Sequence, residues 1–97
     1  MIDMDTALRR LKEALPALRR DHQVASIGFF GSFARGEHQE GSDMDMLVEF
    51  TDTITMFQFL RLEDALSDLL GVKVDLVTPD AVRPAIKQSI MRDVIHA

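Results

Sequence analysis

The chain of 97 residues has no cysteine, which excludes a disulfide framework and a thiolate metal site and is compatible with a reducing compartment. It also lacks an excess of positive charge, because 11 Lys and Arg residues stand against 16 Asp and Glu residues, for a formal net charge of −5. This balance argues against direct binding of nucleic acid, whose backbone attracts clustered cations. No apolar run approaches the length of a membrane span, and the basic N-terminal segment lacks the apolar block of a signal peptide. We therefore expect a cytoplasmic protein with neither a nucleic-acid nor a membrane partner.

The composition is typical of one small globular domain. Hydrophobic residues make up 46% of the chain and charged residues 28%, which is an ordinary globular balance. A chain of this length can build one core. We therefore expect a single domain over residues 1–97, with little material for a lid or for a second substrate-binding domain.

Three apolar segments predict strands at residues 24–30, 43–50 and 72–77. A short helix is expected directly after the first strand. The helical segment between the second and third strands is long enough for a parallel crossover. The sequence therefore predicts an α/β domain, with a three-stranded mixed sheet and flanking helices.

Helical spacing of apolar residues predicts a first long helix before these strands. Asp3 or Asp5 can cap its start, because a carboxylate accepts hydrogen bonds from the free N–H groups of a first turn. Proline is well placed only in a first turn, so we expect Pro16 to interrupt this helix or to begin a second short one.

Two further helices are predicted in the second half of the chain. One begins after Thr53 or Thr55, which can cap it, and ends before Gly71, a natural C-terminal stop. The other follows residues 78–79 and carries an apolar stripe that we expect to join the core rather than an interface. The residues of this stripe are Ile86, Ile90, Met91 and Val94.

Two aspartates open the second predicted strand, within the stretch GSFARGEHQEGSDMDMLVEF at residues 31–50. Asp43 and Asp45 should point to the same face, because side chains alternate along a strand. Adjacent carboxylates repel each other, and burying them unpaired would be costly. A divalent cation resolves this conflict, and hard oxygen ligands favour Mg²⁺.

Asp75 interrupts the otherwise apolar strand VKVDLV at residues 72–77, where a charge needs a reason. If this third strand lies beside the second, Asp75 can join Asp43 and Asp45 and complete a site for two metal ions. One ion would activate an attacking hydroxyl, and the other would hold a triphosphate. We therefore expect all three aspartates to be metal ligands and catalytic residues.

The turn at Gly31 and Ser32 suits the binding of the phosphates. Glycine lets the backbone approach a phosphate closely, and a turn entering a helix offers free N–H groups, to which Ser32 adds a hydroxyl. Arg35 follows on the same short helix and could neutralise phosphate charge. For this turn to face Asp43, the first and second strands must be antiparallel.

These features together resemble a known signature. Gly31 and Ser32, ten spacer residues, Asp43, one spacer and Asp45 at the start of an apolar strand look like the motif of the DNA polymerase β-type nucleotidyltransferase superfamily. Asp75 matches the third carboxylate of that family. The segments LPALRRDHQVASIGFFGSFARG, SDMDMLVEF and KVDLVTPDAVRP all read like members of its minimal nucleotidyltransferase group.

The resemblance implies a fold, a substrate and a partner. The fold would be the nucleotidyltransferase fold, with ATP as the donor and two Mg²⁺ ions as cofactors. Many minimal nucleotidyltransferases are antitoxins paired with HEPN ribonuclease toxins, and some transfer AMP from ATP to a tyrosine of the toxin. By this resemblance the chain would modify a HEPN partner within a hetero-oligomer. Asp43, Asp45 and Asp75 would carry the chemistry, and Gly31, Ser32 and Arg35 would bind the nucleotide.

Other interpretations remain open at this point. The protein could neutralise a toxin by stoichiometric binding without catalysis, although a binder has no need of three convergent carboxylates. It could instead nucleotidylate a small molecule such as an aminoglycoside, which the lack of a second domain disfavours. The aspartates could form only an acidic rim, Ser32 could simply cap the short helix, and Arg35 could be an exposed helical residue.

Overall fold

The computed structural model describes residues 2–37, 39 and 41–97. Met1, His38 and Glu40 lie outside the described residues. In chain order the elements are α1 (Met4–His22), β1 (Val24–Phe29), α2 (Gly31–Ala34), β2 (Met44–Phe50), α3 (Met56–Leu70), β3 (Val74–Val77), the 3₁₀ helix η1 (Pro79–Ala81), α4 (Pro84–Asp93) and β4 (Ile95–His96). The predicted order of helices and strands is confirmed as far as α4.

The sheet has the strand order β3-β2-β1-β4. β1 is antiparallel to β2, and β2 is parallel to β3, so both predicted pairings are confirmed. The predicted count of three strands is wrong, because β4 adds a fourth strand that is antiparallel to β1.

β4 arises because α4 ends before the last residues of the chain. The helix stops at Asp93, and Val94 is extended, with ψ at 135°. The following two residues pair with Gly28 and Phe29. They occupy an edge of β1 that would otherwise present unpaired N–H and C=O groups. A strand of two residues is too short to give an alternating pattern, so the sequence carried no local sign of it.

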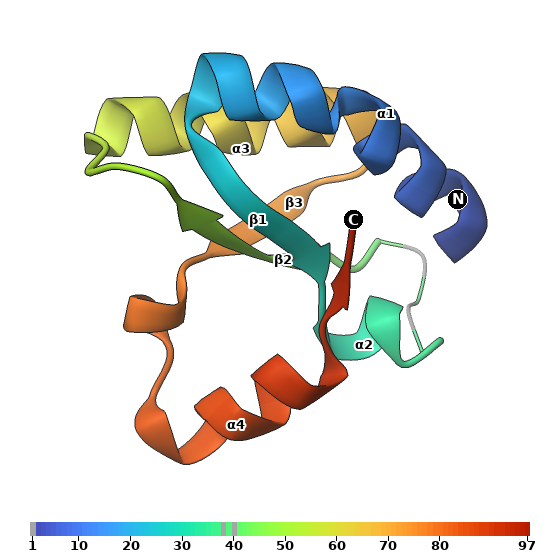
Figure 1. Cartoon of the computed structure of the whole chain (residues 1–97). Coiled ribbons are helices and arrows are strands. Elements are labelled where there is room, and N and C mark those ends of the chain that lie inside the picture. The colour runs from blue at the N-terminus through green and yellow to red at the C-terminus, as the bar shows by residue number, and fades with distance from the viewer. Residues whose placement is uncertain (1, 38, 40) are drawn as a thin grey trace.

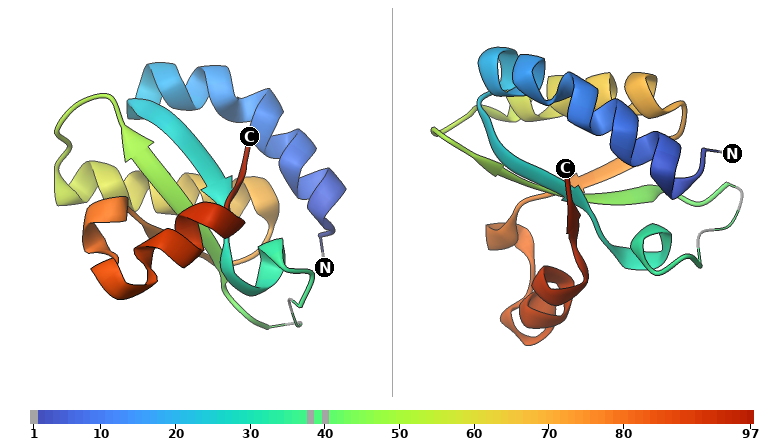
Figure 2. Two further views of the ribbon diagram at one scale, coloured as in Figure 1. Left: turned by 60° about the horizontal axis from the view of Figure 1, so that its bottom comes forward. Right: turned by 45° about the vertical axis from the view of Figure 1, so that its right-hand side comes forward.

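Helices cover the two faces of the sheet unequally. α1 and α3 lie side by side on one face, whereas α2 and α4 lie on the other (Figures 1 and 2). The first face holds the core, since alternate residues of the strands pack there against the two long helices. Its buried side chains include Ala7, Leu11, Leu18, Ile27, Phe29, Met44, Met46, Val48, Leu62, Leu66, Leu70, Val74 and Leu76.

α1 runs without a break from Met4 to His22 and contains Pro16, so the predicted interruption is wrong. Proline has no N–H to donate to the carbonyl four residues earlier, that of Lys12. Both residues are exposed, and water can bind a carbonyl on that side of the helix. The opposite side buries Leu11 and Leu18, whose packing holds the helix together across the missing hydrogen bond.

The predicted caps are present at both long helices. Asp3 caps α1, because its carboxylate accepts the N–H of Thr6 at 2.7 Å, and this hydrogen bond lowers the pKa of Asp3. Thr55 and Gln58 form a capping box at the start of α3. Gly71 ends α3 in the left-handed conformation, with φ at 72°.

The expected burial of the stripe on α4 is wrong. Ile86 is 51% exposed and Met91 is 38% exposed, and no residue of α4 is buried. α4 lies on the face of the sheet opposite α1 and α3 (Figure 2), so its apolar side chains do not reach the core between those helices. No helix in the described part of the chain combines the length and the apolarity needed to cross a membrane.

Gly28 should be essential for the docking of β4. A Cβ atom at this position would lie 2.6 Å from the carbonyl oxygen of Ile95 and 2.9 Å from a methyl group of Val94. We expect Gly28→Ala to displace β4 and to lower the free energy of unfolding by about 1–3 kcal/mol, measured by urea denaturation. The N–H of Ala97, which donates to Ile27 at 3.0 Å, should lose protection from hydrogen exchange.

Ala25→Val is the control for this substitution, because it adds bulk at an exposed position of the same strand. It should leave both the stability and the protection of the Ala97 N–H unchanged. Full protection in Gly28→Ala would show that β4 does not depend on the absence of a side chain here.

Candidate active site

The short helix α2 begins where β1 meets the start of β2. The N–H of Phe30 donates to the carbonyl of Asp45 at 3.1 Å, which continues the antiparallel pairing one step beyond the strand. Gly31 follows as the first residue of α2. The predicted antiparallel arrangement therefore places the Gly31 turn against the aspartate pair.

Gly31 has two reasons to lack a side chain. Its φ is +71°, a left-handed conformation that favours glycine. A Cβ atom at this position would also overlap Oδ2 of Asp45. The carboxylate of Asp45 therefore lies directly over the Gly31 backbone.

An aromatic contact holds α2 in place. Phe33 is buried, and its ring meets the ring of Phe29 edge to face, with centroids 5.2 Å apart. Ser32 precedes it and is half-buried, and its carbonyl accepts the N–H of Glu37 at 2.8 Å. The packing of Phe33 in the core thus fixes the adjacent Ser32 just after the end of β1.

The strand register brings the three aspartates to one face of the sheet. Asp45 and Asp75 are direct partners in the parallel pairing of β2 with β3, so their side chains leave the sheet on the same side. Asp43 precedes Asp45 by two residues and shares that side. The intervening Met44 and its partner Val74 are buried in the core on the other side. The predicted neighbourhood of the second and third strands is confirmed.

The side chains of this aspartate group do not close around a single point. Oδ2 of Asp43 lies 3.9 Å from Nζ of Lys73, with the two side chains 44% and 80% exposed. Across residues 2–37, 39 and 41–97, no three acidic, histidine or cysteine side chains lie close enough together to hold one metal ion as they stand. The backbone therefore brings the aspartates to one face of the sheet, while the carboxylate of Asp43 pairs with Lys73.

This donor set nevertheless fits a divalent cation. All its groups are carboxylates, which are hard oxygen ligands of the kind that Mg²⁺ prefers. An exposed ion pair contributes little stability, so Asp43 can exchange Lys73 for another cation at low cost. Alternation places Lys73 on the same face as Asp75, and its side chain is 80% exposed.

Arg35 lies at the C-cap of α2, where its N–H donates to the carbonyl of Gly31. Its guanidinium Nε lies 3.2 Å from Oε2 of Glu37, and both side chains are at least half exposed. Arg35 is thus paired with an acidic neighbour, and its contact with a phosphate stays a prediction.

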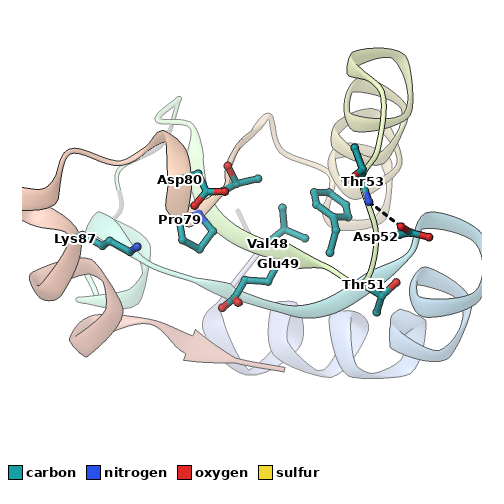
Figure 3. Close-up of a pocket in the computed structure, with 10 residues that line it drawn as sticks. Val48, Glu49, Thr51, Asp52, Thr53, Pro79, Asp80 and Lys87 are labelled. Atoms are coloured by element: carbon teal, nitrogen blue, oxygen red, sulfur yellow. Dashed lines mark hydrogen bonds between the residues drawn. The ribbon is translucent and has the colours of Figure 1, made fainter.

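A pocket of about 760 Å³, which the sequence did not reveal, lies further along β2 (Figure 3). The end of β2, the loop after it, η1 and α4 contribute to its wall. Its polar lining residues include Glu49, Thr51, Asp52, Thr78, Asp80 and Lys87. Alternation along β2 placed Glu49 on the aspartate face, which was the one available signal. The approach of α4, which contributes Lys87 to the wall of the pocket, gave no signal in the sequence.

This chain combines a mixed sheet with a glycine turn that faces a group of aspartates. That arrangement is the one expected of a nucleotide-transferring enzyme. Residues 9–96 match the nucleotidyltransferase domain family. The chain belongs to this family and is a nucleotidyltransferase of the minimal type.

Two relatives and two solved structures illustrate the similarity. The chain is 49% identical over 87 residues to MJ0128 of Methanocaldococcus jannaschii, named as a candidate protein adenylyltransferase, with 89% of each chain covered. It is 40% identical over 79 residues to the protein adenylyltransferase MntA of Thermococcus cleftensis, with 81% of this chain and 80% of the relative covered.

A solved structure of a candidate minimal nucleotidyltransferase superimposes with a TM-score of 0.81 at 39% identity, covering 97% of this chain and 95% of the other. A toxin–antitoxin structure with AMP-PNP superimposes with a TM-score of 0.69 at 25% identity, covering 88% of this chain and 70% of the other. These likenesses agree with the fold expected from the sequence, apart from the number of strands.

Comparing two glycines tests the contact between Gly31 and Asp45. Both Gly31 and Gly36 have positive φ, but a Cβ atom on Gly36 would meet nothing within 4 Å. Gly36→Ala should therefore cost only the conformational strain, about 1–2 kcal/mol. Gly31→Ala should cost at least about 1 kcal/mol more, because it also displaces the Asp45 side chain. Urea denaturation measures both, and equal losses would argue against a tight contact at Gly31.

Proposed function

We propose that this protein transfers AMP from ATP to a protein hydroxyl, a tyrosine of a HEPN-family toxin, and thereby acts as an antitoxin. The observation that carries the proposal is the position of the Gly31 turn against Asp45, with Asp75 beside it in register. Relatives named as protein adenylyltransferases support the donor and the protein acceptor. A toxin–antitoxin neighbour holding AMP-PNP supports the nucleotide and the kind of partner.

Asp43, Asp45 and Asp75 would hold two Mg²⁺ ions. When bound, these ions would neutralise phosphate charge and polarise the reacting phosphoryl group. Asp43 and Asp45 would hold both ions, and Asp75 would hold one of them.

The chain's own groups would position the nucleotide. Backbone N–H groups of the turn at Gly31 and Ser32 would bind the β- and γ-phosphates, and the Ser32 hydroxyl would add a donor. The absence of a side chain at Gly31 lets the phosphates approach the backbone beside Asp45. Ser32 is fixed by the packing of Phe33, so these donors are arranged before the substrate arrives.

Asp75 would assist the acceptor. Its carboxylate would help to remove the proton of the tyrosine hydroxyl as the oxygen forms a bond to the α-phosphorus. The bond from this phosphorus to the bridging oxygen of the β-phosphate breaks, and pyrophosphate leaves. The products are an AMP-tyrosine ester, pyrophosphate and one proton.

The exposure of the site favours a protein acceptor that brings its own orientation. Asp75 and Asp43 are exposed, so water can reach the reacting groups, and nothing in the described part of the chain fixes an acceptor beside Asp75. A docked partner would exclude water and hold its hydroxyl in place, which can supply much of the rate. We therefore expect slow ATP turnover by the isolated protein and rapid transfer with the partner.

Asp75→Asn separates catalysis from binding. With the HEPN partner, ATP and Mg²⁺, the unaltered protein should add AMP-sized mass increments to a partner tyrosine, as seen by mass spectrometry. Asp75→Asn should slow this addition at least about 100-fold, yet should still bind the partner. Asp64→Asn removes a carboxylate from an exposed position of α3 and should transfer AMP normally. Equal neutralisation by both proteins without any increment would instead identify a stoichiometric antitoxin.

The double variant Asp43→Ala with Asp45→Ala tests the metal ligands. It should lose Mg²⁺-dependent binding of AMP-PNP in calorimetric titration, since it removes two oxygen ligands. Without metal it should be folded and at least as resistant to urea, because the repulsion between the carboxylates is also removed. Unchanged Mg²⁺-dependent binding would contradict the assignment.

A further inference from the structure

Side chains of α3 bind the outer edge of β3, which is the edge strand of the sheet beside β2. The N–H of Val74 donates a hydrogen bond to Oγ of Ser67 at 3.0 Å. The N–H of Leu76 donates to Oε2 of Glu63 at 3.1 Å. Backbone donors at the edge of a sheet are otherwise open to a strand of another chain. Ser67 and Glu63 thus take the place that a further strand would have, and we call these two residues the edge clamp.

The spacing of the two contacts suits both elements. Ser67 and Glu63 are four residues apart, so they lie on one side of α3 with a rise of about 6 Å between them. Val74 and Leu76 are two residues apart in a strand, which separates them by about 6.6 Å. The earlier helical residue binds the later strand residue, as expected for a helix that runs antiparallel to the strand that follows it.

The edge clamp is itself held in place by α3. The hydroxyl of Ser67 donates to the carbonyl of Glu63 at 3.0 Å while it accepts the N–H of Val74, and a serine hydroxyl can do both at once. The neighbouring Leu66 and Leu70 are buried in the core. The two acceptors therefore belong to a helix whose position is fixed by packing.

Asp75 lies between the two residues that the edge clamp binds. Val74 and Leu76 are buried on the core side of the sheet, whereas Asp75 is exposed on the other face, opposite α3. β3 has only four residues, and a short edge strand with a partner on one side alone is prone to local opening. The edge clamp restrains the backbone on both sides of Asp75.

We propose that Ser67 and Glu63 are positioning residues for Asp75, which they keep level with Asp45 by holding the outer edge of β3. The inference rests on the proposed function, since it assumes that Asp75 takes part in the transfer of AMP. It adds to that function two residues on the far side of the sheet from the aspartates. A small displacement of a reacting group can cost a large part of the rate.

Glu63→Ala and Ser67→Ala each remove one acceptor of the edge clamp. With the HEPN partner, ATP and Mg²⁺, each should lower kcat for AMP transfer about tenfold, while KM for ATP changes less than about twofold, because the turn at Gly31 is unaltered. Glu63→Gln keeps an oxygen that can accept the N–H of Leu76 and should retain the rate. Asp64→Ala removes an exposed carboxylate of the same helix and is the matched control.

Combining each substitution with Asp75→Asn tests whether the edge clamp acts through Asp75. In the Asp75→Asn background, the tenfold loss should shrink to less than about twofold, because residues that act as a unit do not have additive effects. A general loss of structure would instead slow both backgrounds equally. Circular dichroism checks that each variant is folded. If Glu63→Ala does not fold, Ser67→Ala, which removes a single oxygen atom, serves for the comparison.

Three results would overturn the inference while the proposed function stands. These are a normal rate in Ser67→Ala, an equal loss in both backgrounds, and a loss in Glu63→Gln as large as that in Glu63→Ala. If the unaltered protein transfers no AMP to the partner, the proposed function fails and the inference fails with it.

Discussion

The contact between the Gly31 backbone and the Asp45 carboxylate is the constraint on which the rest of the site depends. It requires β1 and β2 to be antiparallel, with the hydrogen bond from Phe30 to Asp45 closing the pair at 3.1 Å. The end of one strand then meets the start of the next. β3, parallel to β2, adds Asp75 at the same level. A parallel β1 would place the turn and the aspartates at opposite ends of the sheet, and no shared site would form.

Much of this arrangement could be predicted because it depends on alternation along single strands. A period of two fixes Asp43 and Asp45 on one face once Met44 and Met46 are placed in the core. The charge of Asp75 within an apolar strand indicated that this aspartate joins the pair if the third strand lies beside the second, which the parallel pairing of β2 with β3 confirms. β4 could not be predicted in this way, because its two residues are positioned by the unpaired edge of β1 rather than by their own pattern.

The remaining failures also arise from contacts between distant segments. Pro16 stays within α1 because its lost hydrogen bond faces water while the other side of the helix packs into the core. The pocket beside Glu49 requires η1 and α4 to approach β2, and Lys87 carries no sign of this in its local sequence. The pairing of Lys73 with Asp43 could be predicted only in part, since alternation places both residues on one face but does not fix the distance between their side chains.

The charges along this face explain why the chain would need metal ions to bind a triphosphate. Two of the cations near the aspartates are already paired, Arg35 with Glu37 and Lys73 with Asp43. An acidic protein surface of this kind repels a triphosphate unless divalent cations bind first. Phosphate would therefore be stabilised at the aspartate end only together with such ions.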